Sequence, residues 1–172
     1  PWSKHYQMAT YVHEELPGLL QQQFPLNHQA CGIFGHSMGG HGALTLALKY
    51  PKQYHSVSAF APICAPSQCP WGQKALTGYL GNNKNQWKEY DACELIIDRG
   101  WPHQHILIDQ GKQDPFVKEQ LKPELFQEAC LKAGVELKLR MHEHYDHSYY
   151  FITSFIEEHL MFHASRLHAN NN

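Results

Sequence analysis

The segment from Gly35 to Gly39, which reads Gly-His-Ser-Met-Gly, constrains this chain more than any other. It follows a short apolar run over residues 30–34 and precedes a helix-like run over residues 42–50. A serine at such a junction lies in a sharp turn, where a side chain on either flanking glycine would collide with the neighbouring backbone. The pattern therefore predicts a nucleophile elbow that presents Ser37 at the end of a strand.

The rest of the chain alternates between apolar and amphipathic runs. Short apolar runs bounded by turn residues predict buried strands at residues 30–34, 57–61 and 105–109. An alternating run predicts an edge strand at residues 135–141. Helical spacing predicts helices at residues 5–23, 119–133 and 148–166, and the first and last of these are expected to pack on the sheet. The irregular stretch over residues 62–100 is expected to be an excursion near the active site, with short helices at residues 73–80 and 92–99. This alternation indicates an α/β fold, with a mostly parallel sheet flanked by helices and right-handed crossovers.

Length and charge argue against several classes of protein. At 172 residues with 42% hydrophobic content, the chain is long enough for a core, and we expect residues 1–172 to belong to one domain. A net charge of −2 without a basic stripe argues against a nucleic-acid partner, and no apolar run approaches the length of a membrane span. The five cysteines are odd in number and lack metal-ligand spacing, which fits reduced thiols in a cytosol.

A serine hydroxyl is a weak nucleophile, so Ser37 needs a histidine to take its proton and a carboxylate to orient that histidine. The loop after the strand at residues 105–109 carries Asp114, at the strand end where functional groups gather in parallel sheets. Asp109 is a rival, but it lies within the strand, where a hydrogen-bonding role toward the turn is the better interpretation. His147, in the loop before the final helix, is the predicted base.

Three histidines compete in that last loop. With two nearby carboxylates, His142, His144 and His147 could instead form a metal site. Their spacing matches neither the helical i, i+4 zinc motif nor a site with a cysteine pair, so no metal is expected. The chain has 14 histidines, and the others are expected to be solvated side chains, for example His13, His55 and His163.

Acyl transfer also needs hydrogen-bond donors for the developing oxyanion. The N–H of Met38 is one predicted donor, because the residue after the nucleophile begins a helix, where N–H groups are unpaired and the dipole favours negative charge. In such folds the second donor comes from a loop upstream of the elbow. Only 34 residues precede Gly35, and they read as one helix and one strand. We therefore expect earlier strands and the second donor to lie outside this chain.

Several motifs together resemble one known family. They lie in the same order over nearly the whole chain, at residues 5–8, 11–12, 15–17, 35–42, 70–75, 108–112 and 145–152. These motifs resemble the S-formylglutathione hydrolases, also called esterase D, among the α/β-hydrolase esterases. The resemblance implies hydrolysis of S-formylglutathione to glutathione and formate, in formaldehyde detoxification, and general activity on small esters. It also implies Ser37, Asp114 and His147 as the triad, no metal or organic cofactor, and a cytosolic homodimer when full length.

The same resemblance implies an incomplete domain. Family members carry roughly a hundred residues or more before the position of Pro1, so we expect residues 1–172 to be the C-terminal part of a single α/β-hydrolase domain that lacks its N-terminal strands. The strand at residues 30–34 would then lose its upstream neighbour, and an uncovered apolar edge invites pairing with another chain. Weak or no activity is expected from the chain by itself.

Two other functions stay open. A carboxylesterase of the same fold could act on acetyl or feruloyl esters, and a non-catalytic scaffold could keep the elbow without a complete oxyanion hole. Trp71 and Lys74 follow a strand at the active-site end of the sheet, which makes them candidate walls of an acyl or glutathione pocket. A purely structural role for Trp71 in packing is an equal alternative.

Overall fold

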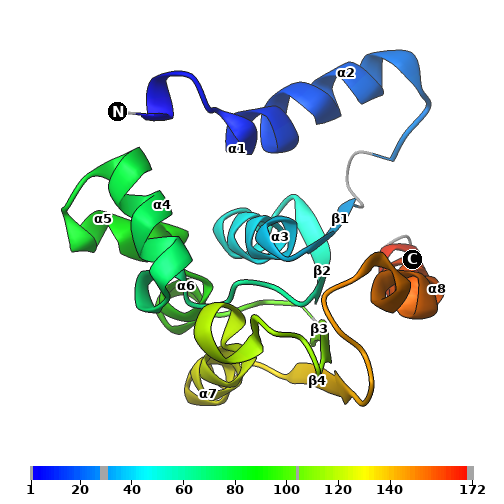
Figure 1. Cartoon of the computed structure of the whole chain (residues 1–172). Coiled ribbons are helices and arrows are strands. Elements are labelled where there is room, and N and C mark those ends of the chain that lie inside the picture. The colour runs from blue at the N-terminus through cyan, green and yellow to red at the C-terminus, as the bar shows by residue number, and fades with distance from the viewer. Residues whose placement is uncertain (1, 28–30, 104, 170–172) are drawn as a thin grey trace.

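Four parallel strands form the centre of the molecule (Figure 1). The computed structural model describes residues 2–27, 31–103 and 105–169, and the spatial order of the strands there is the order along the chain. The strands are β1 (Cys31–His36), β2 (Tyr54–Phe60), β3 (Ile106–Gly111) and β4 (Leu137–His142). The four predicted strands are confirmed, with bounds shifted by one to three residues. Ala30, the first residue of the first predicted strand, lies outside the described residues.

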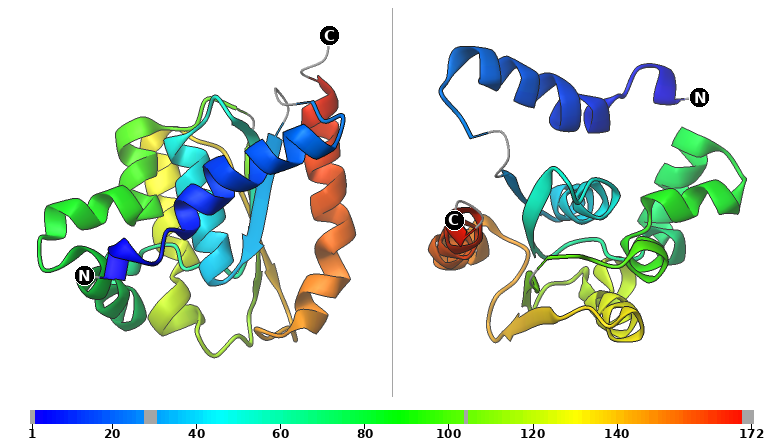
Figure 2. Two further views of the ribbon diagram at one scale, coloured as in Figure 1. Left: turned by 90° about the horizontal axis from the view of Figure 1, so that it is seen from above. Right: turned by 180° about the vertical axis from the view of Figure 1, so that it is seen from behind.

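Helices cover both faces of this sheet (Figures 1 and 2). One face carries α3 (Met38–Lys49), α6 (Ala92–Arg99) and α7 (Pro123–Ala133), and the other carries α8 (Tyr149–Ala169). Between β2 and α6 the chain passes through η3 (Pro66–Gln68), α4 (Pro70–Leu80), α5 (Lys84–Trp87) and η4 (Lys88–Tyr90). No helix within the described ranges is long and apolar enough to cross a membrane. This layered arrangement confirms the predicted α/β class.

The main core fills the layer between the sheet and the three helices on one face. Val57, Ile108 and Phe126 are fully buried there. A smaller cluster includes Phe60, at the end of β2, and Phe151, in the first turn of α8. Burying such a side chain contributes about 1.5–3 kcal/mol relative to leaving it exposed. The two clusters therefore fix the carboxyl ends of the strands and the start of α8, where the candidate site lies.

The helix predicted at residues 119–133 is wrong in its first turn. Residues Val117–Leu121 form a separate π-helical turn, η5, and α7 begins at Pro123. Between them Lys122 has a left-handed backbone, with φ 53° and ψ 52°. Proline lacks an N–H and disfavours right-handed helical backbone in the residue before it, which explains the break.

The N-terminal helical segment runs from α4, where Trp2 packs against Tyr79, to the edge of the sheet beside β1 (Figure 2). It consists of η1 (Trp2–Lys4), α1 (Met8–Thr10), η2 (Tyr11–Glu15) and α2 (Leu16–Gln23). The segment from α1 to α2 buries none of its residues, and a groove of about 520 Å³ lies between α2, β1 and the end of α8. The predicted helix is thus present from residue 8 to residue 23, but it does not bury a face of the sheet as expected.

Candidate active site

Ser37 lies in the predicted turn between β1 and α3. Its backbone has φ 56° and ψ −115°, a strained conformation for a residue with a side chain. The Ser37 N–H donates to the carbonyl of Phe60 at the end of β2 (2.9 Å), and the Ser37 carbonyl accepts from the N–H of His41 in α3 (3.0 Å). The neighbouring strand and helix therefore hold this residue at the carboxyl end of the sheet.

The glycines around Ser37 differ in how much space they have. A Cβ on Gly35 would lie 2.4 Å from the backbone of Gly39, so no side chain fits there. A Cβ on Gly39, by contrast, would meet no described atom within 4 Å. Crowding returns at Gly40, where a Cβ would lie 2.9 Å from the Cβ of Pro62. The expectation that both flanking glycines avoid a collision is confirmed for Gly35 and wrong for Gly39.

Asp114 and His147 are in direct contact. His147 Nδ1 and Asp114 Oδ2 are 2.5 Å apart. The Asp114 side chain is fully buried, whereas 18% of the His147 side chain is exposed. The Phe116 N–H donates to the other carboxylate oxygen, Oδ1, at 2.8 Å. Because Asp114 holds Nδ1, the second ring nitrogen of His147 is the one that can exchange a proton with a reacting group.

The surroundings favour an ionised Asp114. Burial by itself raises the pKa of this carboxyl, but hydrogen bonds from His147, the Phe116 N–H and Gln110 hold the pKa below its ordinary value. An ionised carboxylate at this position favours the His147 tautomer with its proton on Nδ1. This arrangement is suited to orienting a general base.

Main-chain contacts bring the loops of the acid and the base together. A Cβ on Gly111 would lie 2.4 Å from the carbonyl oxygen of Tyr145, so the loop after β4 can pass the end of β3 only because residue 111 is glycine. The Tyr145 carbonyl accepts from the N–H of Gln113 (2.9 Å), and the His142 carbonyl accepts from the N–H of Lys112 (2.9 Å). Backbone geometry, rather than side chains alone, therefore fixes the relative position of acid and base.

The base lies beside the elbow without a hydrogen bond to it. The ring of His36, the residue before Ser37, packs against the ring of His147 with centroids 4.4 Å apart. The Phe116 ring approaches the His147 ring edge-on at 5.1 Å. Among the described residues no hydrogen bond joins Ser37 to His147. Catalytic hydrogen bonds are often open in free enzymes and close in the substrate complex, so this geometry is compatible with a triad.

The candidate oxyanion and substrate residues lie at two helix starts. Met38 is the first residue of α3, and the first N–H groups of a helix have no intrahelical acceptor. Trp71, in the first turn of α4, is 41% exposed, and its backbone N–H donates to Gln120 Oε1 in η5 at 3.0 Å. Lys74 is exposed one turn further along α4. The roles of all three in catalysis or binding stay predictions.

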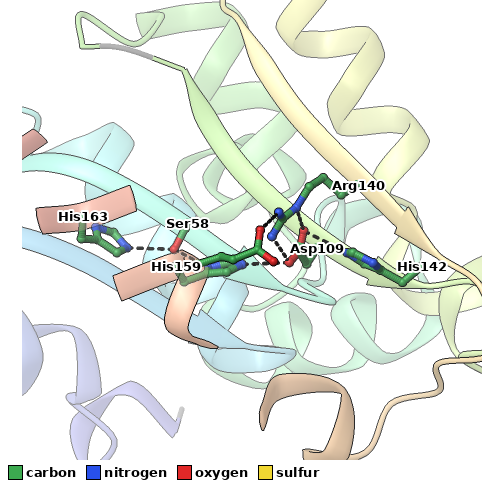
Figure 3. A network of polar contacts seen from close by, with 7 residues as sticks. Ser58, Asp109, Arg140, His142, His159 and His163 are labelled. Carbon is green, nitrogen blue, oxygen red and sulfur yellow. Dashed lines mark hydrogen bonds and ion pairs between the residues drawn. The ribbon is translucent and has the colours of Figure 1, made fainter. Parts of the chain in front are cut away.

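Asp109, the rival acid, has different partners (Figure 3). It accepts two hydrogen bonds of 2.5 Å from the guanidinium of Arg140 in β4, and His159 Nε2 in α8 lies 3.2 Å from its Oδ2. Burial raises the pKa of Asp109, but the bonds from His159 and Arg140 outweigh it and lower the pKa to about 2. A structural role for Asp109 is confirmed. The expectation that it bonds the turn is wrong, because its carboxylate bonds Arg140 of β4 and His159 of α8.

Two histidines of α8 extend this network to β2 (Figure 3). Ser58 Oγ lies 2.8 Å from both His159 Nδ1 and His163 Nε2, and Ser56 Oγ lies 2.6 Å from His163 Nδ1. The expectation that His163 is solvated is therefore wrong, because two serine hydroxyls satisfy its ring under the helix. Ser58, His159 and Asp109 are the residue types of a triad, but Ser58 is fully buried and a substrate cannot reach it.

The three histidines proposed for a metal site point to different neighbours. His147 binds the acid, His144 is exposed beside a glutamine amide, and His142 packs its ring against α8. Within the ranges that the structure describes, no group of three metal-ligating side chains gathers. His13 and His55, expected to be solvated, are half-buried.

Sequence reasoning missed three residues that surround the candidate triad. They are His36, Phe116 and Gln110, and each lies next to a recognised motif. His36 precedes the serine, Phe116 follows the acid by two residues, and Gln110 is the next-to-last residue of β3, before Gly111. Proximity to a motif was the only sequence feature that could have pointed to these residues. The direction of each side chain depends on loop geometry, which the sequence pattern does not specify.

Comparisons with known proteins identify relatives over nearly the whole chain. The Esterase family model matches residues 1–162. S-formylglutathione hydrolases from Rattus norvegicus and Mus musculus are 53% and 52% identical over 170 residues, which is 98% of this chain and 60% of each relative. The chain thus spans about 60% of the length of these relatives.

Solved structures agree with this match. An S-formylglutathione hydrolase from Agrobacterium tumefaciens, 54% identical, superposes with a TM-score of 0.92 over 97% of this chain and 60% of that one. A ferulic acid esterase with a TM-score of 0.73 and 18% identity shares the fold. The chain therefore has the α/β-hydrolase fold and belongs to the esterase family.

Proposed function

We propose that this chain carries the catalytic triad of a serine hydrolase that splits S-formylglutathione into glutathione and formate. The observation that supports this most directly is the 2.5 Å contact between His147 Nδ1 and Asp114 Oδ2, next to an elbow that holds Ser37 at a φ of 56°. The identity of 53% to an S-formylglutathione hydrolase supports the choice of substrate.

The reaction has two halves. Ser37 Oγ attacks the formyl carbon while His147 Nε2 takes the hydroxyl proton, and the N–H of Met38 donates to the oxyanion. The tetrahedral intermediate expels the glutathione sulfur, which receives that proton, and a formyl ester remains on Ser37. Water then attacks this ester with His147 as base, formate leaves, and Ser37 regains its proton. Asp114 stays ionised throughout, and no step needs a metal or an organic cofactor.

Other parts of the assignment extend this proposal. Trp71 and Lys74 form walls of the acyl or glutathione pocket, and the hydrogen bond from Trp71 to Gln120 supports this by tying α4 to the turn that follows the acid. The second oxyanion donor lies outside this chain. The family resemblance supports a cytosolic homodimer for the full-length protein.

A carboxylesterase that acts on acetyl or feruloyl esters is the second candidate. The observation in its favour is Phe116, a 48% exposed aromatic ring in contact with His147, which could receive an aromatic acyl group. Comparing kcat/KM for S-formylglutathione with that for acetyl and feruloyl esters separates the two. A higher value for the esters would replace the proposed substrate.

Labelling by a fluorophosphonate probe tests the nucleophile without assuming a substrate. In the full-length protein we expect peptide mapping to find the added mass on Ser37 alone, and Ser37→Ala to abolish it. Ser165→Ala, which changes an exposed serine of α8, is the matched control and should label like the wild type. Labelling at another residue, or none, contradicts the assignment.

The activity of the chain by itself is a separate question. Because the chain spans about 60% of its relatives, we propose that it needs the remaining strands and the second donor for full activity, and that residues 1–172 alone are weakly active or inactive. Intact-mass measurement of purified material shows whether a second polypeptide accompanies the chain. Full activity of the chain alone would refute this part of the proposal.

A further inference from the structure

We propose that Gln110 is a positioning residue of the triad, whose side-chain amide fixes the Asp114 carboxylate in the orientation that meets His147. The inference rests on the proposed hydrolase function, because it assigns a partner to the acid of that site. Gln110 is the fifth of the six residues of β3, and its side chain is fully buried. It therefore has a rigid base from which to hold the loop that follows.

The carboxylate of Asp114 is held at three points. Gln110 Nε2 donates to Oδ2 at 3.1 Å, the same oxygen that lies 2.5 Å from His147 Nδ1. The N–H of Phe116 donates to Oδ1 at 2.8 Å. With both oxygens bonded from different directions, the carboxylate cannot rotate about its Cβ–Cγ bond without breaking a contact. Gln110 is the one side chain other than His147 that bonds this carboxylate among the described residues.

The orientation of the amide follows from its neighbours. Gln110 Nε2 also donates to the carbonyl oxygen of Gly111 at 3.0 Å, so both groups that it faces are acceptors. Turning the amide over would place Oε1 against the carboxylate and against this carbonyl, and acceptors repel one another. The amide therefore presents its donor to the acid.

Packing alone does not explain a glutamine at this position. Gln110 Oε1 is buried and has no hydrogen-bond partner among the described residues. An unsatisfied buried acceptor costs about 1–3 kcal/mol. A methionine has a similar length and could fill the same space without that cost. The amide is thus better explained by what it donates to, the Asp114 carboxylate.

The donation has a consequence for the chemistry. A carboxylate oxygen that accepts from Gln110 as well as from His147 is a weaker base, so the shared proton stays on Nδ1. The His147 ring is then held with Nε2 free to take the proton of Ser37. Without the amide, Asp114 could turn or draw the proton toward itself, and His147 would lose its productive position.

Gln110→Met removes the donor and keeps the length of the side chain. We expect kcat for S-formylglutathione hydrolysis in the full-length protein to fall about 10- to 100-fold, the usual cost of a misplaced catalytic group, while KM stays nearly unchanged. Gln113→Met is the matched control, because Gln113 lies in the same loop with an exposed side chain. Its kcat should match the wild type.

Gln110→Glu separates positioning from packing, because it keeps the shape and adds a titratable group. The introduced carboxyl would lie beside Asp114, and two carboxyls in contact do not both ionise readily. While protonated, its O–H can donate to Asp114 Oδ2 as the amide does. We expect near-normal kcat at the acid end of the active pH range and a decrease of kcat as the pH rises. The wild type and Gln110→Met should not show this decrease. A pH profile identical to that of the wild type would overturn the proposal, even if Gln110→Met does not fold.

A signal that needs no substrate distinguishes this proposal from the hydrolase proposal. The proton between His147 Nδ1 and Asp114 should give a low-field NMR resonance in ¹⁵N-histidine-labelled protein, and Gln110→Met should shift or broaden it while Gln113→Met does not. If the resonance changes in Gln110→Met and not in Gln113→Met, but the fluorophosphonate probe does not label Ser37, the hydrolase proposal fails and the positioning role stands. If Ser37 is labelled but the resonance and kcat of Gln110→Met match the wild type, the positioning role is refuted.

Discussion

At the scale of single residues, we expect alanine substitutions at the two glycines of the elbow to have opposite effects on stability. Gly35→Ala would force a Cβ to within 2.4 Å of the Gly39 backbone, which has no flexible end that could move away. We expect a loss of about 3 kcal/mol or more in the free energy of unfolding, at the upper end for an overpacked site. Urea unfolding followed by circular dichroism measures this loss.

Gly39→Ala is the matched control for that prediction. Its Cβ would meet no described atom within 4 Å, and alanine favours helix over glycine by up to about 1 kcal/mol. We expect unchanged or slightly higher stability. Equal destabilisation by both substitutions would contradict the steric difference between the two positions.

The acid of the candidate triad gives a second prediction at this scale. In Asp114→Asn the amide cannot supply the negative charge that holds the Nδ1 proton of His147, so the wrong tautomer is favoured. In the full-length protein a fall in kcat of about 10⁴-fold is expected, with the fold retained. Steady-state hydrolysis of S-formylglutathione checks the loss. Asp146→Asn, which changes the exposed neighbour of His147, should keep most of the activity, and equal losses in both variants would remove Asp114 from the triad.

The sequence was sufficient to nominate Ser37, Asp114 and His147 as candidate site residues, whose roles stay predictions, but not the residues that contact them. Ser37 could be predicted because a strand, a tight turn and a helix each leave a local pattern. Asp114 and His147 could be predicted because strand ends gather at one edge of a parallel sheet. The contact of Gln110 with Asp114 could not, since it depends on the return of the loop after β3 toward its own strand, which leaves no local pattern.

At the scale of elements, the chain shows where local patterns are enough. The helix predicted at residues 92–99 has the observed bounds, and the structure shows why it begins and ends there: Asp91 caps its start and Gly100 ends it. The helix predicted through Lys122 was wrong, because the apolar spacing continues across a proline that breaks the backbone. Caps and breakers thus set the element bounds more reliably than periodicity does.

The free energy of unfolding depends on pH through His163, a buried residue of α8. Burial lowers the pKa of His163 to about 4, and the charges of His159 and Arg166 act in the same direction. In the unfolded chain an ordinary histidine has a pKa of about 6.5, so below that pH the unfolded state takes up a proton that the folded state does not. Stability is therefore full above pH 6.5 and falls as the pH drops toward 4, by on the order of 3 kcal/mol.

Measuring the free energy of unfolding between pH 4.5 and 7 checks this prediction. His163→Gln keeps an amide that can bond the two serines of β2 but does not titrate, so its stability should depend less steeply on pH. His168→Gln, at an exposed position of the same helix, should keep the slope of the wild type. If the free energy of unfolding depends on pH equally steeply in all three proteins, His163 is not the cause of the pH dependence.

At the scale of the whole molecule, the feature with the clearest consequence is the edge of β1, which has no neighbouring strand among the described residues. Among the described residues β1 pairs with β2 alone, and the groove beside it is lined by apolar side chains that include Leu16, Leu20 and Ile33. Phe34, in the same strand, is 43% exposed. An uncovered strand edge with apolar neighbours is a template for pairing with another chain.

We therefore expect residues 1–172 alone to associate as concentration rises, and Phe34→Lys to reduce this association, because a lysine on an edge strand opposes edge-to-edge pairing. Sedimentation velocity at increasing concentration measures it, with circular dichroism as the test of folding. Leu131→Lys removes a more exposed apolar side chain, 81% exposed on α7 at the other end of the sheet, and is the matched control. If both lysines suppress association equally, general surface charge explains the effect. If only Phe34→Lys does so, association takes place at the edge of β1, the strand that leads into the Ser37 elbow.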